Sequence, residues 1–395
     1  MKTVNVLPLV LVALRMSDCS FAQTWTQTCA YSNCTAIAAS ADGGKLVAAA
    51  QGSIYTSTDS GASWTSNNVP ENYWKCVASS ADGTKLAALE QFPSGLFSKC
   101  LLYASTNSGA TWMSNNAPNN PSTGAASITL SADGSELVAL LPSQIYISTN
   151  LGASWVLTNN SEVWNAVACS ADGTKLAAFA TRYAIFTPGL YTSTNAGSSW
   201  TLVNSLSGSA IASSADGTKL AAISGNLLYA SADSGLTWTP TSTTVTNWNS
   251  IASSADGSRL VAVASGGSIP QNPTRFGPIY TSTNSGLTWA SNNAPVLYWT
   301  SVASSADGGL LVAVNEAGIW TSQTPPSPSI NVSPTDGNLS FSWIVPSTNF
   351  VLQQSADLIS WADLTNAPAL NLTNLQNQVT LPPSNGSGFY RLKTP

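Results

Sequence analysis

The stretch IYTSTDSGASW, residues 54–64, decides the fold because close copies of it return along the chain. Its last eight residues, STDSGASW, recur with small changes and always end in tryptophan; we call these octapeptides the box motifs. Six complete box motifs begin at Ser57, Ser105, Ser148, Ser193, Ser231 and Ser282. A short apolar segment typical of a β-strand precedes each of them. Such internal repetition predicts a repeat architecture in which each repeat is one small sheet.

A second motif, SADG, occurs seven times at intervals of 39 to 51 residues, which is the length of a four-stranded propeller blade. A strand of small and β-branched residues precedes each SADG, and a leucine follows its aspartate by four residues. This pattern predicts a β-hairpin whose glycine supplies the positive φ of the turn. The Ala and Ser residues of the first strand indicate the innermost position, where sheets crowd around an axis. The SADG aspartates are Asp42, Asp82, Asp133, Asp172, Asp216, Asp256 and Asp307.

Seven SADG turns accompany only six box motifs. The seventh repeat ends at GIWTSQTPP (318–326) without a fourth strand, whereas the segment QTWTQT near the N-terminus carries Trp25 in the place of a box tryptophan. One blade can therefore combine three C-terminal strands with one N-terminal strand, which hides the sheet edges. We predict an all-β fold, a seven-bladed β-propeller over residues 23–323 that is closed by the N-terminal strand.

The box motifs resemble the Asp box, or bacterial neuraminidase repeat, S/T-x-D-x-G-x-T/S-W. This repeat occurs in sialidases, sortilin-type receptors, xyloglucan-degrading enzymes and photosystem assembly propellers, and the resemblance covers about residues 23–325. It implies the propeller fold and leaves the function open. Four of the six boxes have Asn for Asp, which keeps an acceptor oxygen and indicates a structural role. The box residues are Asp59, Asn107, Asn150, Asn195, Asp233 and Asn284, with Trp64, Trp112, Trp155, Trp200, Trp238 and Trp289.

The pattern changes after the Pro/Ser linker at residues 324–329. Four alternating segments, LSFSW (339–343), FVLQQS (350–355), QVTLPP (378–383) and FYRL (389–392), predict a small β-sandwich of the immunoglobulin or fibronectin-III type over residues 330–395. LQQSxDLxxW followed by FYRL resembles the C-terminal modules of exported proteins of Verrucomicrobia-like bacteria. That resemblance implies attachment or sorting at the cell surface.

Residues 1–22 have the layout of a signal peptide, with Lys2, an apolar run and the Ser20-Phe21-Ala22 cleavage pattern. No later apolar run reaches membrane-spanning length, so we expect a protein that is secreted, extracellular, or at a bacterial cell surface or in the periplasm. Five cysteines would remain after cleavage, and their pairing stays open: Cys29, Cys34, Cys76, Cys100 and Cys169.

Composition excludes several classes of function. The chain has no histidine, a net charge of -5 and only 8% charged residues. There is no basic face for nucleic acid, no Ser-His-Asp triad and no histidine-ligated metal. We therefore predict no cofactor, no metal, and a monomer whose partner is an extracellular glycan or protein.

Ligand recognition is expected at the rim opposite the SADG and box turns, where the connections are longest. The candidate contact residues there are Tyr73, Trp74, Trp164, Arg182, Tyr183, Trp248, Arg275, Phe276, Tyr298 and Trp299. The four tryptophans precede the inner strands, so they either pack between blades or form an aromatic ring around the channel mouth that stacks on sugars or peptide side chains.

Catalysis would have to use carboxylates, since a glycosidase needs two of them at one scissile bond. Glu71, Glu90, Glu162 and Glu316 are the candidates on the loop-rich rim, and solvated loop glutamates explain them better than a catalytic pair. A sialidase needs three arginines, and only Arg182 and Arg275 are available on this rim. The sequence thus favours a non-catalytic binding or scaffold propeller; a carboxylate glycoside hydrolase of the sialidase-like class and an assembly factor are the alternatives.

Overall fold

The computed structural model describes residues 24–393 except 32, 71–72, 91–100, 117–126, 142–143, 160–162, 182–187, 242–246, 266–276, 324–329, 336–337, 345–350, 357–358, 367, 372–374 and 383–388. These described residues form strands, turns and irregular segments, and no helix occurs among them. None of the described part could therefore cross a membrane as a long apolar helix.

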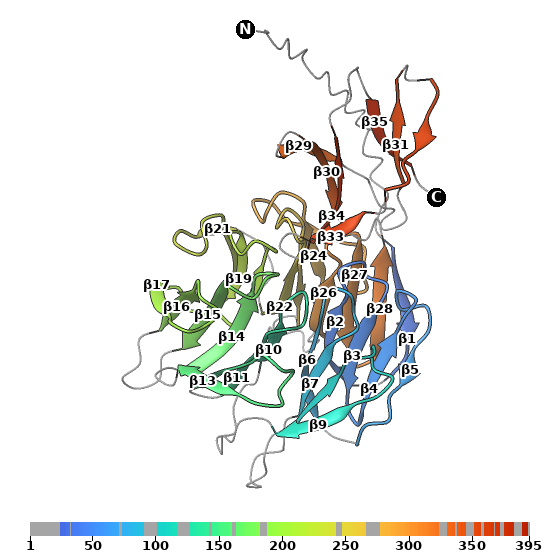
Figure 1. Ribbon diagram of the computed structural model, residues 1–395. Coiled ribbons are helices and arrows are strands. Elements are labelled where there is room, and N and C mark those ends of the chain that lie inside the picture. Colours follow the sequence, from blue (N-terminus) through green and yellow to red (C-terminus); the bar gives the residue numbers. More distant parts are fainter. Residues whose placement is uncertain are drawn as a thin grey trace.

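Seven four-stranded antiparallel sheets lie around a common axis in the order of the chain (Figure 1). We number these blades from the first SADG turn. Blade one consists of β2 (Cys34–Ala39), β3 (Leu46–Ala50), β4 (Ser53–Ser57) and β5 (Thr65–Ser66). Blade two consists of β6 (Trp74–Ser79), β7 (Leu86–Glu90), β8 (Leu101–Ser105) and β9 (Met113–Asn116). Blade three consists of β10 (Ser127–Leu130), β11 (Leu137–Leu141), β12 (Gln144–Ser148) and β13 (Val156–Asn159).

Blades four to seven continue in the same way, each strand pairing with its neighbour. Blade four consists of β14 (Val163–Cys169), β15 (Leu176–Thr181), β16 (Gly189–Ser193) and β17 (Thr201–Asn204), and blade five of β18 (Ala210–Ser213), β19 (Leu220–Ser224), β20 (Leu227–Ser231) and β21 (Thr239–Thr241). Blade six consists of β22 (Trp248–Ser253), β23 (Leu260–Ala264), β24 (Ile279–Ser282) and β25 (Ala290–Ser291). Blade seven consists of β26 (Trp299–Ser304), β27 (Leu310–Asn315), β28 (Gly318–Gln323) and β1 (Trp25–Cys29).

The N-terminal strand closes the last blade, as the count of box motifs predicted. β1 pairs antiparallel with β28, and Trp25 lies opposite Ser322. The indole of Trp25 is buried in the hydrophobic cluster between blades six and seven, together with Val263 and Leu311. Because this pairing covers the free edge of β28, the chain forms a closed ring rather than an open solenoid.

A ring of backbone hydrogen bonds joins the seven blades near the axis. The N–H of each SADG alanine donates to the carbonyl oxygen of the next SADG alanine, and Ala306 donates back to Ala41. The N···O distances are 2.7 Å for six of the bonds and 2.8 Å for the last. The seven methyl groups form a buried cluster, because only a small side chain fits where the blades converge. The alanines of the ring are Ala41, Ala81, Ala132, Ala171, Ala215, Ala255 and Ala306.

Hydrophobic clusters fill the spaces between neighbouring blades. The cluster between blades one and two contains Ile54, Val77 and Tyr103, with the box residue Trp112 packed against it. Each of the other five box tryptophans packs against the cluster of a different pair of blades. These indoles therefore lie between blades, as the motif predicted.

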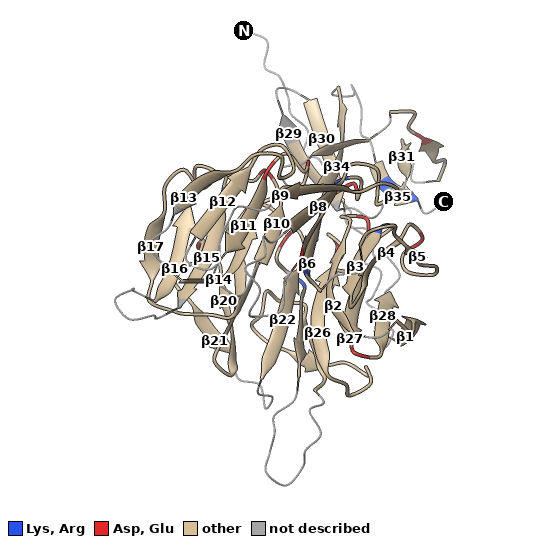
Figure 2. Ribbon diagram, turned by 90° about the horizontal axis from the view of Figure 1, so that it is seen from below, with Lys and Arg blue, Asp and Glu red and all other residues tan. Residues whose placement is uncertain are grey.

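The SADG turns join the first and second strands and the box turns join the third and fourth strands, so both occupy one rim, which we call the SADG rim. The connections between second and third strands and from one blade to the next lie at the opposite, loop-rich rim. Charged residues are sparse over the whole ring (Figure 2).

The C-terminal strands form two further sheets that lie at one end of the ring (Figure 1). One sheet contains β29 (Asn331–Thr335), β30 (Asn338–Ile344), β34 (Gln376–Leu381) and β33 (Ala369–Asn371), and the other contains β32 (Ala362–Asp363), β31 (Val351–Ser355) and β35 (Phe389–Lys393). They share one core, in which Phe341 of the first sheet contacts Tyr390 of the second with ring centroids 4.3 Å apart.

Candidate functional site

The four tryptophans at the start of the inner strands are buried, with exposed fractions of 2% for Trp74, 1% for Trp164, 5% for Trp248 and 0% for Trp299. Each packs against the aromatic side chain in the third strand of its own blade; Trp74, for example, meets Tyr103 edge-on at 5.2 Å. A ligand could not stack on these rings. The aromatic-mouth interpretation is therefore wrong for all four, because the gap between blades takes up their apolar surface.

The two tyrosines that precede Trp74 and Trp299 behave differently. Tyr73 is 55% exposed at the loop-rich rim, although its neighbour along the chain is buried. Tyr298 is half-buried at the equivalent place in blade seven. Each tyrosine lies directly before its strand, in the connection between blades, where it is not held in the gap that buries the tryptophan. Tyr73 is thus the candidate contact residue that presents most surface among those described.

Glu90 is the last residue of β7 and is a buried carboxylate at this rim. It lies opposite Trp74 in the strand register and is 1% exposed. Its Oε2 atom has no hydrogen-bond partner, and the same is true of the Trp74 indole nitrogen. Burial raises the pKa of Glu90 to about 7. The expectation of a solvated loop glutamate is therefore wrong for this residue.

The position of Glu90 contains small or neutral residues in the blades with an equivalent tryptophan. Ala180 and Ala264 occupy it in blades four and six, and Asn315 occupies it in blade seven. Asn315 Oδ1 accepts hydrogen bonds from the N–H groups of Ala317 and Gly318 at 2.7 and 2.9 Å, which closes the turn after β27. Glu90 is therefore the one charged residue at a position that is uncharged in blades four, six and seven. A comparison of the repeats in the sequence could have singled it out for this reason.

The remaining candidate residues divide into one exposed glutamate and a group that the structure does not describe. Glu316 is exposed in the turn between β27 and β28, as expected for a solvated loop residue. Blade one separates it from Glu90 of blade two. The candidates that lie outside the described residues are Glu71, Glu162, Arg182, Tyr183, Arg275 and Phe276.

The box side chains are engaged in their own turns. Asp59 Oδ1 accepts hydrogen bonds from the Ser57 hydroxyl at 2.7 Å and from the Ser63 N–H at 2.8 Å. Asn107 Oδ1 accepts from Ser105 and from the Thr111 N–H, both at 2.9 Å. Equivalent acceptor bonds occur at Asn150, Asn195, Asp233 and Asn284. These side chains hold the turn together and do not project toward a ligand.

Among the described residues, no group of three or more Cys, Asp or Glu side chains could hold a metal ion. Three of the described cysteines are free thiols: Cys29, Cys34 and Cys169. Burial, followed by the proximity of Cys29, raises the pKa of Cys34 to about 12, so Cys34 is a protonated thiol at neutral pH.

No protein-family model matches the chain, and no curated protein sequence is significantly similar to it. Solved structures do resemble it. The GH74 xyloglucanase from Xanthomonas campestris is 15% identical with a TM-score of 0.58 over 82% of this chain, which spans only 59% of that enzyme. The Niastella koreensis GH74 enzyme is 13% identical with a TM-score of 0.60, over 93% of this chain and 72% of the enzyme.

A second kind of neighbour is not named as an enzyme. YCF48 from Cyanidioschyzon merolae is 16% identical with a TM-score of 0.57, over 76% of this chain and 99% of YCF48. A structure of YCF48 bound to D1 peptide superimposes equally well, with 13% identity and a TM-score of 0.57 over 78% of this chain and 98% of YCF48. At such low identity these likenesses establish the fold alone, and they confirm the prediction of an all-β propeller.

Proposed function

We propose that this chain is an exported, non-catalytic binding or scaffold propeller that recognises a protein or a glycan through its loop-rich rim. Residues 1–22 would serve as the signal peptide, residues 23–323 as the recognition ring, and residues 330–395 as an anchor or spacer behind the linker at 324–329. The neighbour that is bound to a peptide supports a ring of this fold as a peptide receptor.

The observation that carries this proposal is that the SADG and box aspartates are engaged in hydrogen bonds that hold their own turns together. The aspartates of the SADG and box motifs accept hydrogen bonds within their own turns, as Asp82 does from Ser80 and Thr84. In the described part of the loop-rich rim, only Glu90 and Glu316 carry carboxylates, and they belong to blades two and seven. An acid and base pair at one scissile bond has no support from this arrangement.

Tyr73 is the residue for testing recognition. The full-length protein is applied to a glycan array and to a peptide library, and the Tyr73→Ala variant is compared with wild type on every probe that binds. Leu287→Ala is the matched control, because Leu287 is 65% exposed in a box turn on the SADG rim. We expect Tyr73→Ala to weaken binding about tenfold and Leu287→Ala to leave it unchanged. If Leu287→Ala loses binding and Tyr73→Ala keeps it, the ligand binds at the SADG rim and the proposal is refuted.

Glycoside hydrolysis is the second candidate, and Glu90 is the observation that favours it. A carboxyl group whose pKa is about 7 can donate a proton to a leaving-group oxygen at neutral pH, provided that the groups that now bury Glu90 move aside for the substrate. Turnover on a broad panel of glycans should be measured for wild type and for Glu71→Gln, Glu90→Gln, Glu162→Gln and Glu316→Gln. Cleavage that disappears in one of these variants would establish the enzyme and refute the non-catalytic proposal.

A further inference from the structure

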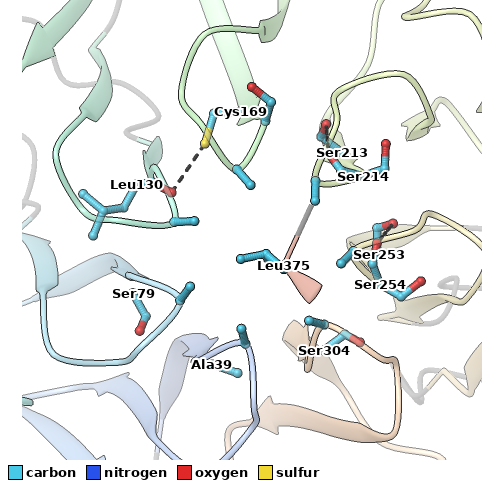
Figure 3. Close-up of a pocket in the computed structure, with 18 of the residues that line it drawn as sticks. Ala39, Ser79, Leu130, Cys169, Ser213, Ser214, Ser253, Ser254, Ser304 and Leu375 are labelled. Carbon is cyan, nitrogen blue, oxygen red and sulfur yellow. Dashed lines mark hydrogen bonds between the residues drawn. The ribbon is translucent and has the colours of Figure 1, made fainter. Parts of the chain in front are cut away.

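The central channel contains a cavity at its SADG end, with a volume of about 190 Å³. Its wall includes the methyl groups of the SADG alanines and the side chains that directly precede the SADG serines (Figure 3). These preceding residues include Ser79, Leu130, Cys169 and Ser213. Every blade thus contributes to the wall of the cavity, mostly with small side chains, and Leu130 is the larger exception.

One side chain of this wall comes from outside the propeller. Leu375 directly precedes β34, in the connection from β33, and in Figure 3 its side chain lies near the middle of the ring of blades. It packs against the cluster of the seven SADG alanines and is itself half-buried. The C-terminal sheets therefore contact the ring at its axis through an aliphatic side chain.

The backbone of Leu375 has an unusual conformation. Its φ is +54°, in the left-handed region that glycine and asparagine tolerate and a leucine disfavours. Such a conformation persists only where surrounding contacts compensate for it. At Leu375 the compensating contact is the packing of the side chain against the alanine methyl groups.

The mouth offers few free hydrogen-bond donors to an inserted group. The hydroxyl hydrogens of Ser79, Ser213, Ser253 and Ser304 are already donated to the carbonyl oxygens of the serines that follow them, at 2.8 to 3.0 Å. The alanine N–H groups are used in the ring of hydrogen bonds. A polar side chain inserted there would find few donors, whereas an aliphatic side chain buries surface without loss.

We propose that the channel mouth at the SADG rim is a docking site for an aliphatic side chain and that Leu375 is its occupant. The C-terminal sheets are then seated on the ring and close this end of the channel, so that the loop-rich rim points away from them. This proposal concerns the face opposite the recognition rim and does not depend on what that rim binds.

The test uses the whole chain with a protease recognition sequence inserted in the 324–329 segment. After cleavage, size-exclusion chromatography shows whether the C-terminal fragment stays with the ring. Leu375→Asn is the informative variant, because asparagine tolerates the left-handed backbone and removes only the apolar contact. Ile359→Asn is the matched control, since Ile359 lies between β31 and β32 of the same C-terminal sheets and is 83% exposed.

We expect the cleaved wild type and the Ile359→Asn variant to elute as complexes. The Leu375→Asn fragments should separate, because the affinity of the C-terminal fragment for the ring should be at least tenfold lower. Near-ultraviolet circular dichroism of the uncleaved variants, which should equal wild type, reports that the C-terminal core is intact. Separation of the wild-type fragments, or co-elution of the Leu375→Asn fragments with wild-type affinity, would each overturn the proposal.

Closure of the channel is measured separately with Cys169, whose thiol is in the cavity wall. A small thiosulfonate reagent is allowed to react with uncleaved protein, and modification of Cys169 is followed by peptide mass spectrometry. We expect modification at least fivefold faster in Leu375→Asn than in wild type or Ile359→Asn. Equal rates would show that Leu375 does not close the mouth.

Discussion

At the scale of single residues, the box turn explains why Asp and Asn can replace each other. In the first box the Ser63 hydroxyl donates to Asp59 Oδ2, whereas in the second the Asn107 amide donates to the Thr111 hydroxyl at 2.9 Å. A hydroxyl can act as donor or acceptor, so it reverses its role and keeps the bond in both cases. The charge is therefore dispensable for the turn, although it makes the turn sensitive to acid.

Asp59→Asn should remove part of this acid sensitivity. Hydrogen bonds from the Ser63 hydroxyl and N–H and from the Ser57 hydroxyl lower the pKa of Asp59 to about 2. A lowered carboxyl pKa stabilises the fold above about pH 4, and this contribution is lost as the pH falls toward 2. We expect equal urea midpoints for variant and wild type at pH 7 and a higher midpoint for the variant at pH 2.5. Asn107→Asp should show the opposite change, and identical acid profiles would contradict this account.

Glycine in the box turn is required for two reasons that substitution can separate. Gly61 has φ of +88°, and an added Cβ would lie 2.9 Å from Thr321 Cγ2 of the neighbouring blade. Gly52, in the turn between β3 and β4, is the comparison: its φ is +91°, and no atom lies within 4 Å of an added Cβ. We expect Gly52→Ala to lower the free energy of unfolding by about 1 kcal/mol and Gly61→Ala by about 2–4 kcal/mol, as measured by urea denaturation. Equal losses would show that contact between the blades adds nothing.

At the scale of the secondary-structure elements, lysines link successive SADG turns. Lys45, Lys85, Lys175 and Lys219 follow their aspartates by three residues, and each ammonium group donates to the backbone carbonyl of the aspartate in the next turn at 2.7 to 3.0 Å. Glu136 occupies this position in blade three, where it has no ammonium group to donate to the Asp172 turn. Burial, followed by the charges of Asp133 and Asp172, raises the pKa of Glu136 to about 7.

Glu136→Lys should therefore stabilise the protein by restoring the missing link. A raised carboxyl pKa favours the folded state at low pH, and that contribution is lost as the pH rises through 7. The gain from lysine should be small at pH 5 and about 1 kcal/mol at pH 8 in urea unfolding. Glu136→Gln is the control that removes the charge without adding the donor, and it should recover only part of the gain. A destabilised lysine variant at pH 8 would refute the proposed link.

At the scale of the whole molecule, three kinds of contact join the two ends of the propeller sequence: a strand pairing, a buried side chain and a backbone hydrogen bond. β1 completes the seventh sheet, Trp25 fills the space between blades six and seven, and the Ala306 N–H completes the ring of backbone bonds to Ala41. Each of these contacts connects residues from opposite ends of the propeller sequence. The ring therefore gains its last stabilising contacts only when the N-terminal strand is in place.

Removing β1 should convert the ring into a self-associating protein. A mature chain that begins at Ala30 exposes the β28 edge, including Trp320, and open edges pair with other chains. Light scattering after size-exclusion chromatography should show oligomers or aggregates. Trp25→Ala keeps the strand, so it should remain monomeric while losing about 3 kcal/mol of unfolding free energy. A monomeric truncated chain with the melting temperature of wild type would show that closure does not need β1.

The sequence by itself determined the all-β repeat fold and the place of the closing strand, because SADG hairpins and box turns are local structures whose glycine, Asx and hydroxyl residues lie close together along the chain. It also separated the SADG rim from the loop-rich rim. Only the tertiary structure decided that Trp74 is buried while Tyr73 is exposed, that Glu90 is a buried carboxylate whose Oε2 atom has no hydrogen-bond partner, and that Leu375 reaches the axis. These features depend on contacts between blades and between distant segments, and a side chain's burial cannot be read from its neighbours in sequence when the packing partner is dozens of residues away or more.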